Sequence, residues 1–80
     1  MRKFRVRRRP LPGIGQLFEL DTSSGLTLSV VSHRSGRRDL VVAERGAEKP
    51  IVTAPLSRGE ASAVAALLTG VHIELTVTST

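Results

Sequence analysis

The side chains that could do chemistry in this chain are seven carboxylates, two histidines and several serines. Acid–base catalysis needs two such groups held at one substrate. The spacing of the carboxylates pairs none of them, and His33 and His72 fall on different predicted strands with no third metal ligand nearby in sequence. No serine stands in a nucleophile elbow. The sequence therefore predicts no catalytic residue and no metal site, in a protein that is not an enzyme and acts by binding.

A short glycine motif, Gly13-Ile14-Gly15, is the feature that suggests a phosphate-binding loop. It lacks the third glycine of dinucleotide sites and the Gly-Lys-Ser/Thr of phosphate loops, and no helix is expected directly after it. Pro12 fixes φ, while Gly13 and Gly15 accept positive φ. The motif therefore predicts a structural turn with Ile14 in the core, and no cofactor site in this segment.

The positive charge is concentrated at one end of the chain. Six of the 12 basic residues lie in the first nine positions, which leaves six basic residues against all seven acidic ones, a net charge of −1 from Pro10 onward. A small nucleic-acid-binding domain that uses this arginine-rich N-terminus is the alternative function. It lacks Tyr and Trp for base stacking, and both Phe residues fall on predicted core faces. Weak contact of the basic segment with an anionic membrane surface also stays open.

The composition limits the size and location of the fold. The absence of cysteine excludes disulfides and thiolate zinc sites, and 80 residues allow one domain with a modest aliphatic core. Such a core leads us to expect a homodimer or support from a further segment of chain. No apolar run reaches the roughly 18 residues of a membrane span. We expect a cytoplasmic protein.

The pattern of apolar and polar residues predicts two regions and five to six short strands. Residues 1–10 form a basic N-terminal strand or tail, and residues 11–80 form a single small domain. The expected strands are 3–8, 16–21, 26–33, 37–44, 51–54 and 72–78.

The strongest hairpin joins 26–33 to 37–44. We interpret Ser35-Gly36 as its two-residue loop, which places Val30 opposite Val41 and His33 opposite Arg38. In the same register Val31 faces Leu40, Leu28 faces Ala43, Ser32 faces Asp39 and Arg34 faces Arg37. Both faces of the ribbon are then apolar near the middle, so one is expected to meet a helix and the other a second sheet or subunit. The sequence leaves open whether His33 or His72 senses pH.

One helix is predicted over residues 58–69. Ser57 and Glu60 have the spacing of a capping box, and Gly70 suits the left-handed position after the last turn. The expected buried stripe of this helix is Ala61, Val64, Leu67 and Leu68, with Ala63 and Ala66 on its other side. The fold class is α+β, a bent antiparallel sheet with this helix packed on it.

Two groups of residues follow from these elements. The candidate partner contacts are the exposed arginines of the N-terminus and of the hairpin tip, namely Arg5, Arg7, Arg8, Arg9, Arg34, Arg37 and Arg38. The structural turns and caps are Pro12, Gly13, Gly15, Gly36, Ser57, Glu60 and Gly70.

An ordered series of short segments resembles the N-terminal domain of the KhtT-type regulatory subunit of bacterial potassium/proton antiporters. The resemblance covers roughly residues 11–70. It rests on Leu11-Pro12-Gly13-Ile14-Gly15, Phe18-Glu19, Ser24-Gly25, Gly36-Arg37-Arg38-Asp39-Leu40, Leu56-Ser57, Glu60-Ala61, Ala65, Leu68 and Gly70. The first nine residues, rich in arginine, are not part of this pattern.

The resemblance implies a cytoplasmic protein, peripheral to the inner face of the membrane, that contacts a membrane antiporter and sets its cation:proton antiport activity. In that family a second domain of the TrkA C-terminal (RCK-C) type follows, which binds cyclic di-AMP and forms dimers. The segment in hand would then carry no cyclic di-AMP site of its own.

Overall fold

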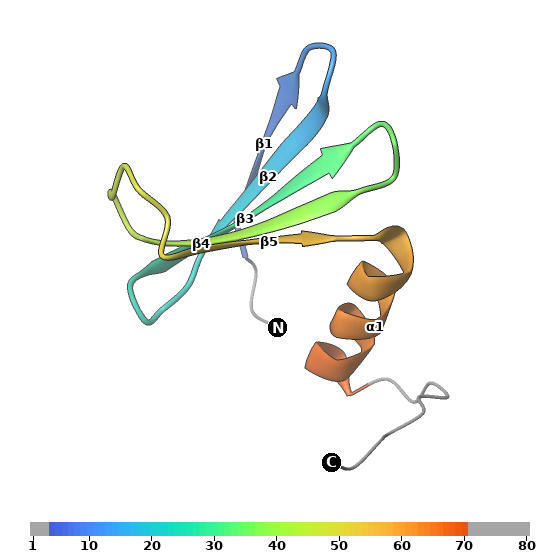
Figure 1. Ribbon diagram of the computed structural model, residues 1–80. Coiled ribbons are helices and arrows are strands. Elements are labelled where there is room, and N and C mark those ends of the chain that lie inside the picture. The colour runs from blue at the N-terminus through green and yellow to red at the C-terminus, as the bar shows by residue number, and fades with distance from the viewer. Residues whose placement is uncertain (1–3, 71–80) are drawn as a thin grey trace.

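The computed structural model describes residues 4–70 of the chain. Within that range the chain forms strands β1 (Val6–Leu11), β2 (Gly15–Asp21), β3 (Leu26–His33), β4 (Arg38–Glu44) and β5 (Val52–Leu56), then helix α1 (Arg58–Thr69). Each strand pairs antiparallel with the next one along the chain, in the order β1-β2-β3-β4-β5. The sheet is strongly twisted and open at β1 and β5 (Figure 1). This confirms the α+β class, while the strand expected at 72–78 lies outside the described residues.

The basic N-terminal segment enters the sheet as its first edge strand. The strand starts at Val6 and continues to Leu11, later than the expected 3–8. Its turn into β2 has Pro12 at the second position and Gly13, with φ of +79°, at the third, and the Ile14 N–H donates to the Leu11 carbonyl oxygen at 2.9 Å. This is the sequence signature of a type II turn.

Ile14 does not enter the core as expected, since 48% of it is exposed. It lies at the end of the β1–β2 hairpin that points away from α1, where no second layer covers the sheet (Figure 1). Gly13 and Gly15 therefore adopt the positive φ values of the turn, but the turn does not bury Ile14 between them.

The β3–β4 register differs by one residue from the predicted register. The Gly36 N–H donates to the His33 carbonyl oxygen at 3.0 Å, and the His33 N–H donates to that of Arg37 at 2.9 Å. The connection thus has three residues, 34–36, with Gly36 at φ of +101°. A type I turn followed by a left-handed glycine is the usual three-residue hairpin loop. The two-residue interpretation was wrong because it took Arg34 and Arg37 as the closing pair, whereas His33 and Arg37 close the loop.

The corrected register sorts the side chains onto two different faces. Val30 lies opposite Leu40 and Leu28 opposite Val42, whereas Val31 lies opposite Asp39. A shift of one residue in register changes every facing pair, because side chains alternate along a strand. The prediction that both faces are apolar in the middle is therefore wrong.

We call the two sides the apolar face and the polar face. The apolar face carries Val6, Phe18, Leu20, Leu28, Val30, Leu40, Val42, Val52, Ala54 and Leu56, together with the polar or charged Arg8, Gln16, Ser32, Arg38 and Glu44. The polar face carries Arg7, Arg9, Glu19, Asp21, Thr27, Ser29, His33 and Asp39 around Leu17, Val31 and Val41.

Local signals fix both ends of α1, and its bounds match the predicted 58–69. The Ser57 hydroxyl accepts from the Glu60 N–H at 3.1 Å, and the Glu60 carboxylate accepts from the Ser57 N–H at 2.8 Å. Gly70 has φ of +75°, and its N–H donates to the Ala66 carbonyl oxygen. Capping box and left-handed C-cap are therefore both confirmed.

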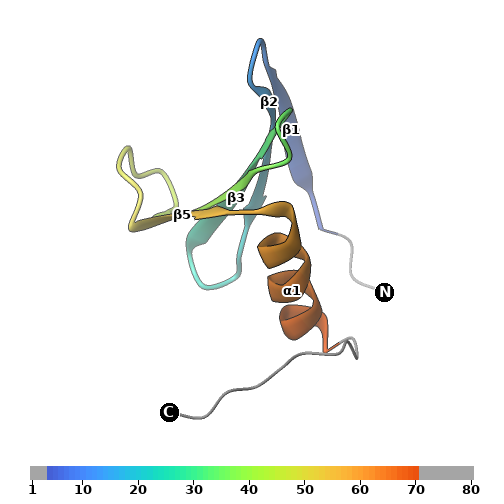
Figure 2. The same cartoon turned by 45° about the vertical axis from the view of Figure 1, so that its right-hand side comes forward.

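The helix is not buried along the predicted stripe. Ala61 and Val64 are half-buried, but Leu67 and Leu68 are 66% and 79% exposed. Ala66, placed on the back of the helix by sequence, is the one buried hydrophobic side chain among the described residues. Since α1 follows β5 after a single residue, it leaves the sheet at a steep angle, as Figure 2 shows, and its later turns move away from the apolar face.

A pair of glycine substitutions tests the β1–β2 turn. A Cβ on Gly15, where φ is +155°, would overlap the carbonyl oxygen of Ser32, whereas a Cβ on Gly13 would meet nothing within 4 Å. We expect Gly15→Ala to lower the free energy of unfolding by at least about 2 kcal/mol. Gly13→Ala should cost only the left-handed penalty of about 1 kcal/mol. Urea unfolding followed by circular dichroism measures both, and equal losses would contradict this packing.

Candidate partner-binding surface

The candidate arginines do not form one patch. Along β1, Arg7 and Arg9 lie on the polar face and Arg8 lies on the apolar face, because neighbouring side chains alternate. Arg34, Arg37 and Arg38 lie at the β3–β4 loop, which β2 and β3 separate from β1. Arg5 precedes β1 and is exposed. The arginines therefore differ in what surrounds them.

Arg7 is already held within the sheet. Its Nη1 and Nη2 donate to the Asp21 carboxylate at 2.9 and 3.1 Å, and its Nε lies 4.0 Å from the Glu19 carboxylate. The Thr27 hydroxyl donates to the same Asp21 carboxylate at 2.8 Å. The hydrogen bonds from Arg7 and then from Thr27 lower the pKa of Asp21 to about 2. This bidentate pair ties β1 to β2, so Arg7 is first a structural residue.

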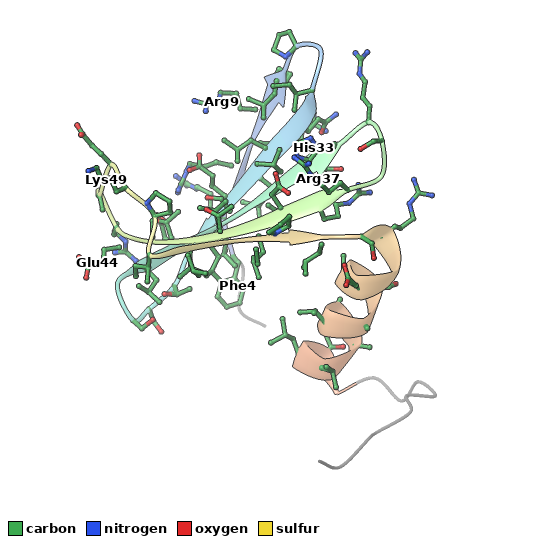
Figure 3. All side chains as sticks on the ribbon, in the orientation of Figure 1. Phe4, Arg9, His33, Arg37, Glu44 and Lys49 are labelled. Atoms are coloured by element: carbon green, nitrogen blue, oxygen red, sulfur yellow. The ribbon has the colours of Figure 1, made fainter. Side chains whose placement is uncertain are left out.

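A second ionic cluster links β3 and β4 beside their turn. The His33 Nε2 lies 2.7 Å from Asp39 Oδ2, and Arg37 lies 3.2 Å from that oxygen and 3.1 Å from Oδ1 (Figure 3). An ionised carboxylate only accepts, so the hydrogen of this bond is on Nε2. The bond from His33 and then that from Arg37 lower the pKa of Asp39. The expected arrangement of His33 beside Arg38 is wrong, since its neighbours are Asp39 and Arg37.

The turn between β3 and β4 collects further guanidinium groups. Arg38 donates to the carbonyl oxygens of Gly36 and Arg37 at 3.0 and 3.3 Å. Arg58, at the start of α1, covers Gly36 so closely that a Cβ there would lie 3.2 Å from its Nη2. The Arg34 N–H donates to the Ile14 carbonyl oxygen at 2.9 Å, which joins the two hairpin ends. Arg58 was not among the arginines predicted from the sequence, although its place directly after the helix cap could have indicated it.

Two hollows open on the apolar face. One is a groove of about 310 Å³ between α1 and the sheet, lined by Val30, Arg38, Leu40, Leu56, Ala61, Val64, Ala65 and Leu68. The other, of about 480 Å³, is lined by Pro10, Leu11, Pro12, Gly15, Gln16, Phe18, Ser32, His33 and Arg34. They adjoin each other, because Phe18 lies opposite Val30 and Ser32 lies opposite Arg38. A concave surface therefore runs from β1 to α1, apolar in the groove beside α1 and more polar in the hollow beside β1.

Residues 4–70 contain neither a candidate metal site nor a candidate membrane span. No group of three or more His, Cys, Asp or Glu side chains in that range could hold a metal ion. No helix within it is long and apolar enough to cross a membrane.

Comparison with known proteins decides the family. Residues 4–72 match the family described as K(+)/H(+) antiporter subunit KhtT, N-terminal domain. The chain belongs to this family. Because the match begins at residue 4, Arg5, Arg7, Arg8 and Arg9 fall within the family domain rather than outside the resemblance. The match therefore confirms the predicted relationship and extends it over β1.

A curated relative supports the same assignment. The K(+)/H(+) antiporter subunit KhtT of Bacillus subtilis (strain 168) is 32% identical over 66 residues, which is 81% of this chain and 40% of the relative. The chain thus spans less than half the length of the KhtT subunit that it matches.

The ion pair of Arg7 gives a pH-dependent prediction. Because folding lowers the pKa of Asp21 to about 2 from its ordinary 3.8, the pair stabilises the fold above about pH 4 and loses this effect as the pH falls toward 2. In Arg7→Met the pKa of Asp21 should rise toward 3.8, as measured by NMR titration of its carboxyl carbon. Arg9→Met, on the same face of β1, is the control and should leave it near 2. An unchanged pKa in Arg7→Met would contradict the bidentate geometry.

Proposed function

We propose that this domain is a non-catalytic regulatory module of a potassium/proton antiporter and acts by contact with the membrane subunit at its cytoplasmic side. The observation that carries the proposal is the family match over residues 4–72. The open, concave apolar face supports it, because a surface of this kind on a small domain is suited to protein contact.

The regulatory step has a simple thermodynamic requirement. A bound subunit changes transport only if it binds two states of the antiporter with different affinities. In this proposal a following domain of the TrkA C-terminal type binds cyclic di-AMP, and residues 4–70 pass its effect to the transporter. The longer KhtT relative, of which this chain covers 40%, supports a protein with more than this one domain.

Transport in vesicles tests the proposal. Proteoliposomes that hold the antiporter should change their rate of potassium-dependent proton exchange when the full-length subunit is added. The change should be lost when residues 1–70 are deleted and should respond to cyclic di-AMP. A transport rate that is the same with and without the subunit, at any messenger concentration, would contradict the regulatory role.

The nucleic-acid alternative has less support once the arginines are placed. Arg7 is bound by Asp21, and Arg37 lies against Asp39, so two of the candidate phosphate contacts are already paired. That alternative predicts affinity for nucleic acid that falls steeply with salt and disappears when Arg8 and Arg9 are neutralised. Contact of the same residues with anionic membrane remains a prediction from sequence.

The homodimer is a separate part of the proposal. It was inferred from the modest aliphatic core and from a ribbon with two apolar faces, and the observed register does not support the second of these grounds. We therefore assign self-association to the full-length chain, in which a following domain makes the dimer. Size-exclusion chromatography with light scattering should give a dimer for the full-length protein at micromolar concentration, and a monomer would remove this part of the proposal.

A further inference from the structure

We propose that the apolar face between β1 and α1 is the docking site for the antiporter subunit, and that it takes a segment in which apolar side chains are flanked by acidic ones. The identity of the partner rests on the proposed function. The assignment of the face and of the chemistry of its occupant rests on packing, strand edges and charge.

Among residues 4–70, the packing leaves this face open. Helix α1 forms one wall of the groove, yet Leu68, which lines it, is 79% exposed. Further along the sheet, Val6 and Val52 are 54% and 50% exposed, and Phe4, 66% exposed, lies on the same side as α1 (Figure 3). Exposed apolar side chains that gather on one face, with polar groups around them, are typical of a site of protein contact. A segment laid along the groove would add to the small core that residues 4–70 form.

The edges of the sheet direct a partner to the face. Pro10 lies within edge strand β1, and Pro55 lies within edge strand β5. A proline cannot donate to a neighbouring strand, and charged side chains on an edge also oppose pairing. Addition of a partner strand to either described edge is therefore disfavoured.

The charges on the apolar face define the occupant. Among the described sheet residues, this face carries Arg8 and Arg38 and one acid, Glu44. Glu44 lies at the end of the sheet away from α1 (Figure 3), and within residues 4–70 no salt bridge forms to Arg8. The other strand acids, Glu19, Asp21 and Asp39, are on the polar face. Arg38 thus lines the apolar groove, and Arg8 lies on the same face at β1, an arrangement that complements acidic groups beside apolar ones.

The same charges argue against a second copy of this domain as the occupant. A symmetric contact places the same patch on both sides. Such a contact would bring together two arginines and one glutamate from each copy, and the surplus of positive charge would oppose it. A partner with acidic residues meets no such repulsion.

Crosslinking from single cysteines tests the face. The chain has no cysteine of its own, so Leu40→Cys on the apolar face and Val41→Cys on the polar face give matched sites for a photoactivated label in the full-length protein. Bound to the antiporter in nanodiscs, the Leu40→Cys variant should crosslink to an antiporter segment with acidic and apolar residues, and Val41→Cys should not. Crosslinks from Leu40→Cys to a second copy, to residues 71–80 or to a following domain would overturn the proposal.

Charge reversal tests the occupant. Arg8→Glu should weaken binding to the antiporter by about tenfold or more, while Arg9→Glu, its neighbour on the other face of β1, should change it less than about twofold. Arg8→Gln removes the charge without reversing it and should weaken binding less than Arg8→Glu does. Urea unfolding checks that each variant is folded. If wild-type protein does not bind the antiporter, the proposed function fails and this site fails with it. If it binds and both reversals act equally, only the docking surface is wrong.

Discussion

The three-residue turn between β3 and β4 is the constraint on which the rest of the structure depends. Gly36, at φ of +101°, closes the turn after His33, and this sets the pairing of Val30 with Leu40 along the central hairpin. With a two-residue turn, each face would carry a mixture of apolar and charged side chains. The observed register instead places most of the aliphatic residues on one side, where α1 lies, and most of the charged side chains on the other.

The two faces consequently have different roles. On the polar face, charged side chains pair with one another. Arg7 binds Asp21 on the neighbouring strand, and His33 and Arg37 bind Asp39. Within residues 4–70 the apolar face is only partly covered, because α1 covers only the part of it next to β5 and leaves the groove open. A domain built this way gains stability when a partner covers that groove, which is the physical basis for a subunit that works by contact.

Features set by local chemistry could be predicted from the sequence. The bounds of α1 and of β3, the capping box at Ser57 and the left-handed Gly70 all depend on a few adjacent residues. The exposure of Leu67 and Leu68 could not be predicted, since it depends on the angle at which α1 leaves the sheet, and that of Ile14 depends on how far the β1–β2 hairpin extends from α1. The contacts of Arg7 with Glu19 and Asp21 could have been predicted only in part. A three-residue loop at 12–14 places Arg7 opposite Glu19, so the correct loop length would have found the contact with Glu19.

The most direct test of this account is the cross-strand register itself. Because His33 and Arg37 form a hydrogen-bonded pair and such pairs alternate along the hairpin, Val30 and Leu40 form a non-hydrogen-bonded pair whose Cα atoms lie close together. A nuclear Overhauser spectrum of the labelled domain should show a strong contact between the Hα atoms of Val30 and Leu40, and another between those of Leu28 and Val42. Contacts of Val30 with Val41 would show a two-residue turn, and would contradict the separation into apolar and polar faces on which the docking surface depends.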